Sequence, residues 1–353
     1  MATLNNLQGL RFLAFILIYL NHAYGLISTG KIFDYGARGV ELFFILSGYL
    51  IVYGFANRND VLVDSSWKAC FSYLKNKLKK FYFLHILTFL IAAYVISCIN
   101  PGYPGMLRNA FLGITLLKSW YKPAMFSFNG ATWFLSTMLF CWFFVPKING
   151  LFKNCKHSVL LISFFILYLF SMTIDEMVFK ARYPLPEAIS LYVFPPYRLI
   201  HFVLGYLGYF LLRDLDKDSL GGSFNLSLLQ LGLLVGTIYV YIALDKTFVY
   251  TQFILFDIIL IHLISINGGI FDILFGNKVF THLGNISFEL YILHGELLSL
   301  GRLYLLPLEI NKIMVFILVF IITYLLSEFF HLRNVHNFIT NKVWCLGKKR
   351  STI

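Results

Sequence analysis

The sequence predicts an all-α fold, a polytopic transmembrane bundle of about ten helices with both termini in the cytoplasm. Three observations lead to this fold class. First, 59% of the 353 residues are hydrophobic, only 13% are charged, and the mean hydropathy is +0.74, which lies outside the usual composition of soluble domains. Second, apolar runs of about 20 residues, the length that crosses a hydrocarbon core, recur along the chain. Third, the Lys and Arg residues between these runs are more numerous on one side.

Ten apolar runs are candidates for membrane spans. They begin near Leu10, Val40, Phe81, Thr132, Val159, Tyr197, Phe224, Phe248, Ile286 and Ile313. The first run lacks both the basic segment and the small-residue cleavage site of a secretory signal, so we expect a retained helix. An even number of spans puts both ends on one side, and the bias of Lys and Arg makes that side cytoplasmic.

The segments between the runs are too short to fold as soluble domains. We therefore expect residues 1–353 to form one transmembrane domain with no fused extracytoplasmic domain, located in the cell membrane as a multi-pass protein. The five cysteines show no CxxC spacing, and their odd number argues against a disulfide framework. The net charge of +12 is common in membrane proteins with basic cytoplasmic loops. The expected partner is the lipid bilayer, and neither nucleic acid nor a metal is expected.

Two ionisable residues lie in the first apolar run. A charged side chain at the centre of a membrane helix costs about 2.5–3.5 kcal/mol, so such residues tend to face protein or water and to mark function. Arg11 and His22 are 11 positions apart, which places them on one helix face about 16 Å apart along the axis. Snorkelling to the membrane surface explains an arginine near the helix end but not an imidazole half a bilayer deeper on the same face.

Glu41 lies just inside the second span, and a short loop joins this span to the first. We expect its carboxylate to approach His22. A carboxylate beside an imidazole fixes its tautomer and raises its basicity, as in the base and orienter pairs of hydrolases and acyltransferases. A purely structural ion pair is the alternative interpretation.

Four lysines, Lys75, Lys77, Lys79 and Lys80, cluster before the third apolar run. Two interpretations have equal weight. The cluster anchors the protein to anionic lipid, or it binds an anionic ligand.

Small and polar residues interrupt two other spans. Ser47 and Gly48 stand among bulky neighbours, which permits close helix approach or passage of a thin ligand. Ser287, Tyr291 and His294 recur at positions i, i+4 and i+7 and form one polar stripe. Such a stripe favours an interior cavity over lipid.

Together these residues resemble a known family. Arg11 followed by ten residues and His22 resembles the Arg-x10-His signature of the acyltransferase family 3 membrane proteins, ten-helix O-acyltransferases of bacterial envelope and secreted polysaccharides. Further family landmarks follow in the same order: the Gly39 to Leu50 segment, Lys77-x-x-Lys80, Trp133-x-x-Ser136, Arg198, the Gly284 to His294 segment and Glu328. The resemblance covers nearly the whole chain.

The resemblance implies a function and a division of roles. It implies transfer of an acyl group, most often acetyl, from cytoplasmic acetyl-CoA to a carbohydrate or glycolipid hydroxyl on the other side. His22 is then the general base or a transient acyl carrier, and Glu41 orients it. The implied donor-binding residues are Arg11, Lys75, Lys77 and Lys80, and the implied cavity or acceptor residues are Ser47, Trp133, Ser136, Arg198, Tyr291 and His294. Arg198 is the expected acceptor residue at the external mouth.

The chain departs from the family pattern in three ways. Lys77 and Lys80 replace two arginines, which keeps the charge but loses the bidentate geometry for phosphate. Met138 stands where many members have a glutamate. The fused hydrolase-like domain of longer members is absent, so a second step would be performed by this domain itself or by a separate extracytoplasmic partner.

Two other functions fit parts of the sequence. A transporter or flippase of a polar or acylated envelope precursor would also contain intramembrane His and Glu, but the spans show no paired Gly/Pro interruptions in corresponding halves. A structural scaffold leaves the cost of Arg11, His22 and Glu41 unexplained.

Overall fold

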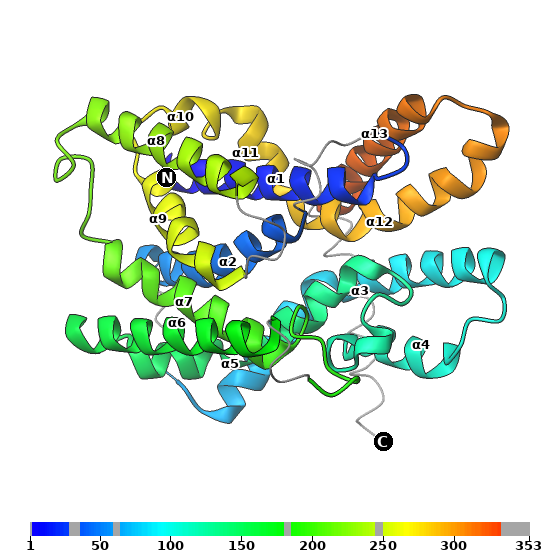
Figure 1. Ribbon diagram of the computed structural model, residues 1–353, viewed down its shortest axis with the longest axis horizontal. Helices are drawn as coiled ribbons and strands as arrows, with labels where there is room; N and C mark the ends of the chain where they lie inside the picture. The colour runs from blue at the N-terminus through cyan, green and yellow to red at the C-terminus, as the bar shows by residue number, and fades with distance from the viewer. Residues whose placement is uncertain (1, 28–35, 59–63, 180–184, 244–249, 333–353) are drawn as a thin grey trace, which may run out of the picture.

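The computed structural model describes residues 2–27, 36–58, 64–179, 185–243 and 250–332, and this part of the chain is helical and contains no β-strand (Figure 1). The predicted all-α class is confirmed. The α-helices are α1 (Ala2–His22), α2 (Gly36–Arg58), α3 (Trp67–Ile99), α4 (Met106–Ile114), α5 (Trp133–Phe152), α6 (His157–Phe179), α7 (Pro195–Leu212), α8 (Ser223–Ala243), α9 (Ile254–Ser265), α10 (Phe271–Leu274), α11 (Lys278–Asn285), α12 (Ser287–Tyr304) and α13 (Lys312–His331). Short 3-10 turns, among them η2 (Lys118–Trp120), η4 (Gly130–Thr132) and η5 (Tyr250–Phe253), join several of them.

Five helical segments are long and apolar enough to cross a membrane. They are Gly36–Phe55, Trp67–Ile99, Gly130–Phe152, His157–Val178 and Lys312–His331. Two shorter apolar helices lie at Ser223–Tyr239 and Ile254–Ser265, and α1, α7 and α12, which contain most of the polar residues discussed below, cover further predicted runs. The expected start near Phe248 lies outside the described residues. The number of spans and the side on which the termini lie stay predictions.

Helix α3 begins at Trp67, well before the expected start near Phe81. The Ser66 side chain caps the helix and accepts a hydrogen bond of 3.2 Å from the Ala69 N–H. The 33 residues of α3 extend about 50 Å, which exceeds the hydrocarbon thickness of about 30 Å. The lysine cluster therefore lies within the helix, and its members point to different faces.

Helix α1 lies at the centre of the bundle. It packs against α2, α11 and α12, while α5 packs between α3 and α7, and α12 also packs against α13 (Figure 1). The outer helices α3, α6, α8 and α13 expose large apolar side chains such as Leu90, Ile166, Leu228 and Ile317. In a membrane protein these outer faces contact lipid, so the polar residues of α1, α2, α7 and α12 face one another inside.

Helices α2 and α7 touch through their backbones. A Cβ added at Gly48 would overlap the carbonyl oxygen of Phe202, and a Cβ added at Gly205 would overlap that of Ile45. Small residues allow membrane helices to approach this closely. Because Glu41 lies seven residues before Gly48 and Arg198 lies seven residues before Gly205, these two charged residues face each other across the same contact.

Candidate active site

A cavity of about 180 Å³ lies between α1, α2, α3, α5 and α12 and collects four of the predicted site residues, Arg11, Ser47, Lys77 and Tyr291. The remaining lining residues are Phe43, Leu46, Leu50, Ile51, Phe134, Met138, Trp142, Ser287 and Phe288. Residues that are up to 280 positions apart in the chain thus meet around one space. We call this space the Arg11 cavity.

Two cations line the Arg11 cavity among mostly apolar neighbours. The Arg11 Nη1 donates to the Gln8 Oε1 over 3.1 Å, one turn earlier on α1. The Lys77 Nζ lies 5.2 Å from the centre of the Tyr73 ring and 5.6 Å from that of Trp142. Two cations that line one cavity, Arg11 from α1 and Lys77 from α3, form a place where an anionic group gains charge-assisted hydrogen bonds.

His22 pairs with His294 and not with Glu41. Its Nδ1 lies 2.8 Å from the His294 Nε2, and the two rings stack with centroids 5.0 Å apart and planes at 15°. The His294 Nδ1 lies 2.6 Å from the backbone oxygen of Tyr291. Tyr291 itself lines the Arg11 cavity, so the histidine pair contacts a residue of the cavity wall.

The hydrogen-bond geometry sets the tautomer of both imidazoles. A carbonyl oxygen only accepts, so the His294 Nδ1 carries the proton that binds the Tyr291 oxygen. The neutral His294 ring then accepts at Nε2, and the His22 Nδ1–H is the donor. This assignment leaves the unprotonated nitrogen of His22 at Nε2. An imidazole held this way is a general base with a defined direction.

Arg302 on α12 holds the end of α1, a role that was not predicted from the sequence. Its Nη2 donates to the backbone oxygen of His22 over 2.6 Å and to that of Tyr24 over 3.1 Å. The last carbonyls of a helix have no partner within the helix and attract cations. Arg302 therefore fixes the backbone from which the His22 ring projects. The sequence signal for this role was a charged residue in the last turn of an apolar helix, α12.

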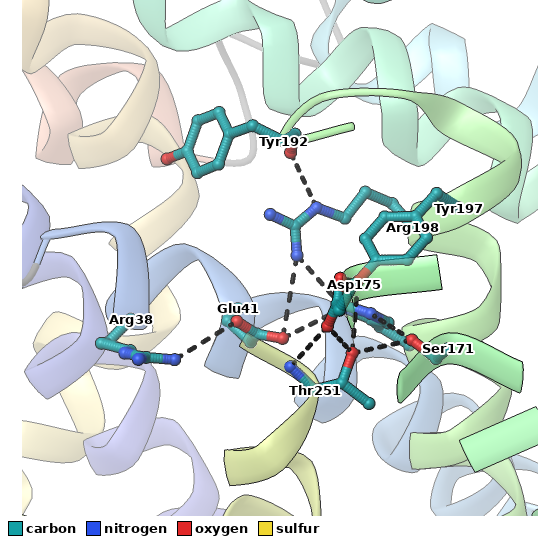
Figure 2. A network of polar contacts seen from close by, with 9 residues as sticks. Arg38, Glu41, Ser171, Asp175, Tyr192, Tyr197, Arg198 and Thr251 are labelled. Carbon is teal, nitrogen blue, oxygen red and sulfur yellow. Dashed lines mark hydrogen bonds and ion pairs between the residues drawn. The ribbon is translucent and has the colours of Figure 1, made fainter. Parts of the chain in front are cut away.

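The expected contact between Glu41 and His22 is wrong. Figure 2 shows Glu41 in a different cluster, where its Oε1 lies 3.0 Å from the His201 Nδ1 and 3.8 Å from the Arg198 Nη1, and its Oε2 lies 3.9 Å from the Arg38 Nη1. The cause is the rotation of α2, which turns its Gly48 face, and Glu41 with it, toward α7. The structural ion pair, given above as the alternative, describes Glu41 better.

The cluster around Glu41 continues through buried polar residues that link α2, α6, α7 and η5 (Figure 2). His201 lies 3.2 Å from the hydroxyl of Ser171, which lies 2.8 Å from that of Thr251. The Asp175 carboxylate accepts hydrogen bonds from the Tyr197 and Thr251 hydroxyls. Two carboxylates thus lie among two guanidiniums, an arrangement that limits the cost of burying each charge.

Arg198 does not lie at an open mouth, contrary to the expectation. Its side chain is fully buried, and its Nε donates to the Tyr192 backbone oxygen over 2.8 Å. Tyr192 and the Glu41 cluster cover the Arg198 side chain in the described structure, so a carbohydrate or glycolipid substrate does not reach it.

Trp133 and Ser136 lie away from the Arg11 cavity. The buried Trp133 ring packs on Tyr192 with centroids 4.9 Å apart. The Ser136 Oγ accepts from the Ser119 N–H over 3.2 Å and lines a larger cavity on the other side of α5. Lys75 lines that larger cavity too, and Lys80 is exposed and lines neither of the two cavities. The structure therefore divides the predicted site residues into separate groups.

No group of three or more His, Cys, Asp or Glu side chains is arranged to hold a metal ion within the described ranges.

A comparison with protein families identifies the chain. Residues 4–331 match the family model described as an acyltransferase domain, acyltransferase family 3. The chain belongs to this family.

The chain is also similar to a curated acyltransferase. Over 232 residues the chain is 25% identical to the acyltransferase MdmB of Streptomyces mycarofaciens, and the match covers 60% of this chain and 58% of that protein. The chain thus aligns with little more than half of that protein's length. No solved structure matches the chain.

Proposed function

We propose that this chain is a membrane O-acetyltransferase that moves the acetyl group of acetyl-CoA to a hydroxyl of a cell-envelope or secreted polysaccharide or of a glycolipid. The observation that carries the proposal is the pairing of His22 with His294 directly behind the Arg11 cavity. Acyl transfer from a phosphate-containing thioester needs two parts, an oriented base and a cationic cavity.

Arg11 and Lys77 bind the phosphates of the donor in this proposal. The cavity that they line measures about 180 Å³, less than the roughly 300–1,000 Å³ of sites that enclose a drug-sized ligand. It therefore encloses only part of coenzyme A in this proposal. Lys75 and Lys80 have no place in the donor site, because neither lines the cavity.

Tyr291 separates the Arg11 cavity from the histidines. It is buried, and its hydroxyl donates to the Ala131 backbone oxygen over 2.8 Å. The thioester reaches His22 when this ring swings aside. Tyr291 is thus the proposed gate between donor and base, with Ser47 on the cavity wall beside it.

His22 acts at its Nε2 in the proposed reaction. This nitrogen takes the proton of the acceptor hydroxyl while the hydroxyl oxygen attacks the thioester carbonyl carbon. The tetrahedral intermediate then expels the coenzyme A thiolate, which takes the proton back from His22. In the second version of the mechanism, Nε2 attacks the thioester carbonyl carbon first and expels the coenzyme A thiolate. The acyl-histidine then passes the acyl group to the hydroxyl oxygen, and the hydroxyl proton neutralises the thiolate. His294 orients His22 in both versions.

The sides of the membrane follow from the predicted orientation. Arg11 and Lys77 then face the cytoplasm, where acetyl-CoA is made, and His22 lies toward the opposite surface. The acceptor is a carbohydrate or glycolipid at that surface of the cell membrane, and a separate extracytoplasmic partner would perform any later step.

Acceptor-dependent release of coenzyme A tests the proposal. The full chain is reconstituted in proteoliposomes with acetyl-CoA outside or inside and a glycolipid acceptor in the bilayer, and free thiol and acetylated acceptor are measured together. We expect both products in equal amounts. A transporter or flippase would move a substrate without releasing coenzyme A, and that result contradicts the proposal.

Two lysine variants test the donor site. Lys77→Ala should raise the apparent KM for acetyl-CoA roughly tenfold, since a hydrogen bond to a charged group contributes about 1.5–3 kcal/mol. Lys68→Ala is the matched control, because Lys68 is exposed at the first turn of the same helix and lines neither of the two cavities. An unchanged KM in Lys77→Ala would remove Lys77 from the donor site.

A further inference from the structure

A second cavity lies along α3 and is separate from the Arg11 cavity. It measures about 1050 Å³ and runs between α3, the end of α4 with η2, and α5. The two cavities have no lining residue in common. We call it the α3–α5 groove.

The α3–α5 groove is apolar and open at its side. Its walls include Phe71, Phe83, Leu117 and Trp120, and each of these side chains is at least 38% exposed. The Arg11 cavity, in contrast, is lined by buried side chains such as Tyr291. In a membrane protein an apolar groove that opens sideways is accessible from the lipid phase.

Two lysines interrupt the apolar α3 wall of this groove, with Phe71 before them and Tyr82 and Phe83 after them. Lys75 and Lys79 both line it, and their spacing of four residues puts them on one face of α3. Lys77, between them, points to the opposite face and lines the Arg11 cavity. Of the four lysines in the cluster, Lys77 thus lines the Arg11 cavity, and Lys75 and Lys79 line the α3–α5 groove. Lys80 lines neither.

Lys79 is only half-exposed although it lies on an apolar wall. A lysine in this position packs its aliphatic stem along the wall and directs its ammonium to the polar region of the membrane. Lys75 reaches the same region one turn earlier. The groove thus joins a long apolar surface to a pair of positive charges.

We propose that the α3–α5 groove binds one anionic phospholipid, with its headgroup phosphate at Lys75 and Lys79 and an acyl chain along the groove in contact with Trp120. Charge complementarity selects the headgroup, and the apolar wall accommodates the chain. This site is independent of the acyl-transfer chemistry, because it shares no residue with the Arg11 cavity.

Trp120 lines the groove and provides a reporter of an acyl chain inside it. The full chain is placed in vesicles of unlabelled phosphatidylcholine. In one series, increasing amounts of phosphatidylglycerol with dibrominated acyl chains are added, and in a second series, increasing amounts of phosphatidylcholine with the same brominated chains. Bromine quenches tryptophan fluorescence on contact, and the difference between wild type and Trp120→Phe isolates the Trp120 signal. We expect half-quenching at a roughly 25-fold lower fraction of brominated phosphatidylglycerol, since each of the two lysines near an anionic lipid contributes about 1 kcal/mol, about fivefold in binding.

Three variants decide whether the groove accounts for this preference. The double variant Lys75→Gln with Lys79→Gln should quench equally with both lipids. The matched control, Lys153→Gln with Lys156→Gln, makes the same change of charge between α5 and α6, outside the groove, and should keep the preference. Thr115→Phe fills the groove at an exposed position and should weaken quenching by both lipids.

Three results would overturn the proposal. Equal quenching by the two lipids in the wild type would show ordinary bulk lipid in the groove. A preference that survives the removal of Lys75 and Lys79 would place the anionic site elsewhere. Unchanged quenching in Thr115→Phe would show that no acyl chain lies in the groove.

Discussion

At the scale of single residues, the direction of two hydrogen bonds decides what His22 can do. The Tyr291 carbonyl oxygen fixes the proton of His294, and His294 in turn fixes that of His22. Metal-binding and catalytic histidines are oriented through the same kind of contact, usually with a carboxylate or a carbonyl as the acceptor. Here a second histidine takes the place that a carboxylate was expected to take.

Replacement of His294 should therefore lower turnover without weakening donor binding. His294→Ala leaves the His22 Nδ1–H without its acceptor, and we expect kcat to fall roughly 10–100-fold, in the range of losses when an orienting partner is removed, with little change in KM. His294→Gln offers an amide oxygen as acceptor and should recover part of the loss. Steady-state kinetics in proteoliposomes measures both parameters. A rise in KM alone would instead assign His294 to substrate binding.

Glu41→Gln should act on stability more than on chemistry. The change leaves Arg198 and Arg38 without the carboxylate that they flank, and breaking a buried ion pair by removing one partner costs about 3–5 kcal/mol. Thermal unfolding in detergent should show a clearly lower Tm, while the kcat of the folded fraction stays close to that of wild type. A normal Tm together with a lost kcat would restore Glu41 as the orienter of His22.

At the scale of helices, the contact between α2 and α7 positions the Glu41 cluster. The two glycines that permit this contact lie seven residues after Glu41 and Arg198. The sequence thus contained a signal for this pair, a shared seven-residue spacing on two helices. The rotation of a helix about its own axis decides which partner a buried carboxylate contacts. For α2 this rotation depends on packing against α7, so the sequence of α2 alone does not predict it.

Gly48→Ala should strongly destabilise the protein. The new Cβ overlaps the Phe202 backbone oxygen, and overpacking against a backbone that cannot move aside costs about 3 kcal/mol or more. Gly54→Ala on the same helix is the matched control, because a Cβ there meets no atom within 4 Å. Thermal unfolding of both variants in detergent measures the difference. Equal Tm values would contradict the close contact of α2 and α7.

The apolar runs predicted most helices but misplaced the start of α3. Lysines interrupt the hydropathy signal from Lys75 to Lys80, yet lysine is a good helix former and does not end a helix. The Ser66 cap marks the true start. The signature residues Arg11 and His22 were predictable because they share one helix, whereas the His22–His294 pair joins two helices 272 positions apart and required the tertiary structure.

At the scale of the whole molecule, the two ends of the bundle have different chemistry. Arg11 and the lysines of α3 lie toward one end, and His22, Arg302 and the Glu41 cluster lie toward the other. The distribution of basic residues predicts that the lysine end is cytoplasmic. The proposed path for the acyl group needs this orientation.

Two native cysteines test the orientation. Cys98 is exposed near the end of α3, and Cys155 is partly exposed between α5 and α6. In variants that keep a single cysteine, a membrane-impermeant maleimide should label Cys98 in intact cells. It should label Cys155 only after the membrane is permeabilised. The reverse pattern would invert the proposed sides of donor and acceptor.

The most direct test of the central claim, that His22 performs the acyl transfer, is a single-turnover measurement with labelled acetyl-CoA. Wild type, His22→Ala and the control His157→Ala, which changes an exposed histidine at the first turn of α6, are compared in proteoliposomes at equal amounts of folded protein. We predict that the rate falls at least about 100-fold in His22→Ala, the lower end of what a general base contributes, and stays at the wild-type level in His157→Ala. An undiminished rate in folded His22→Ala would contradict the account.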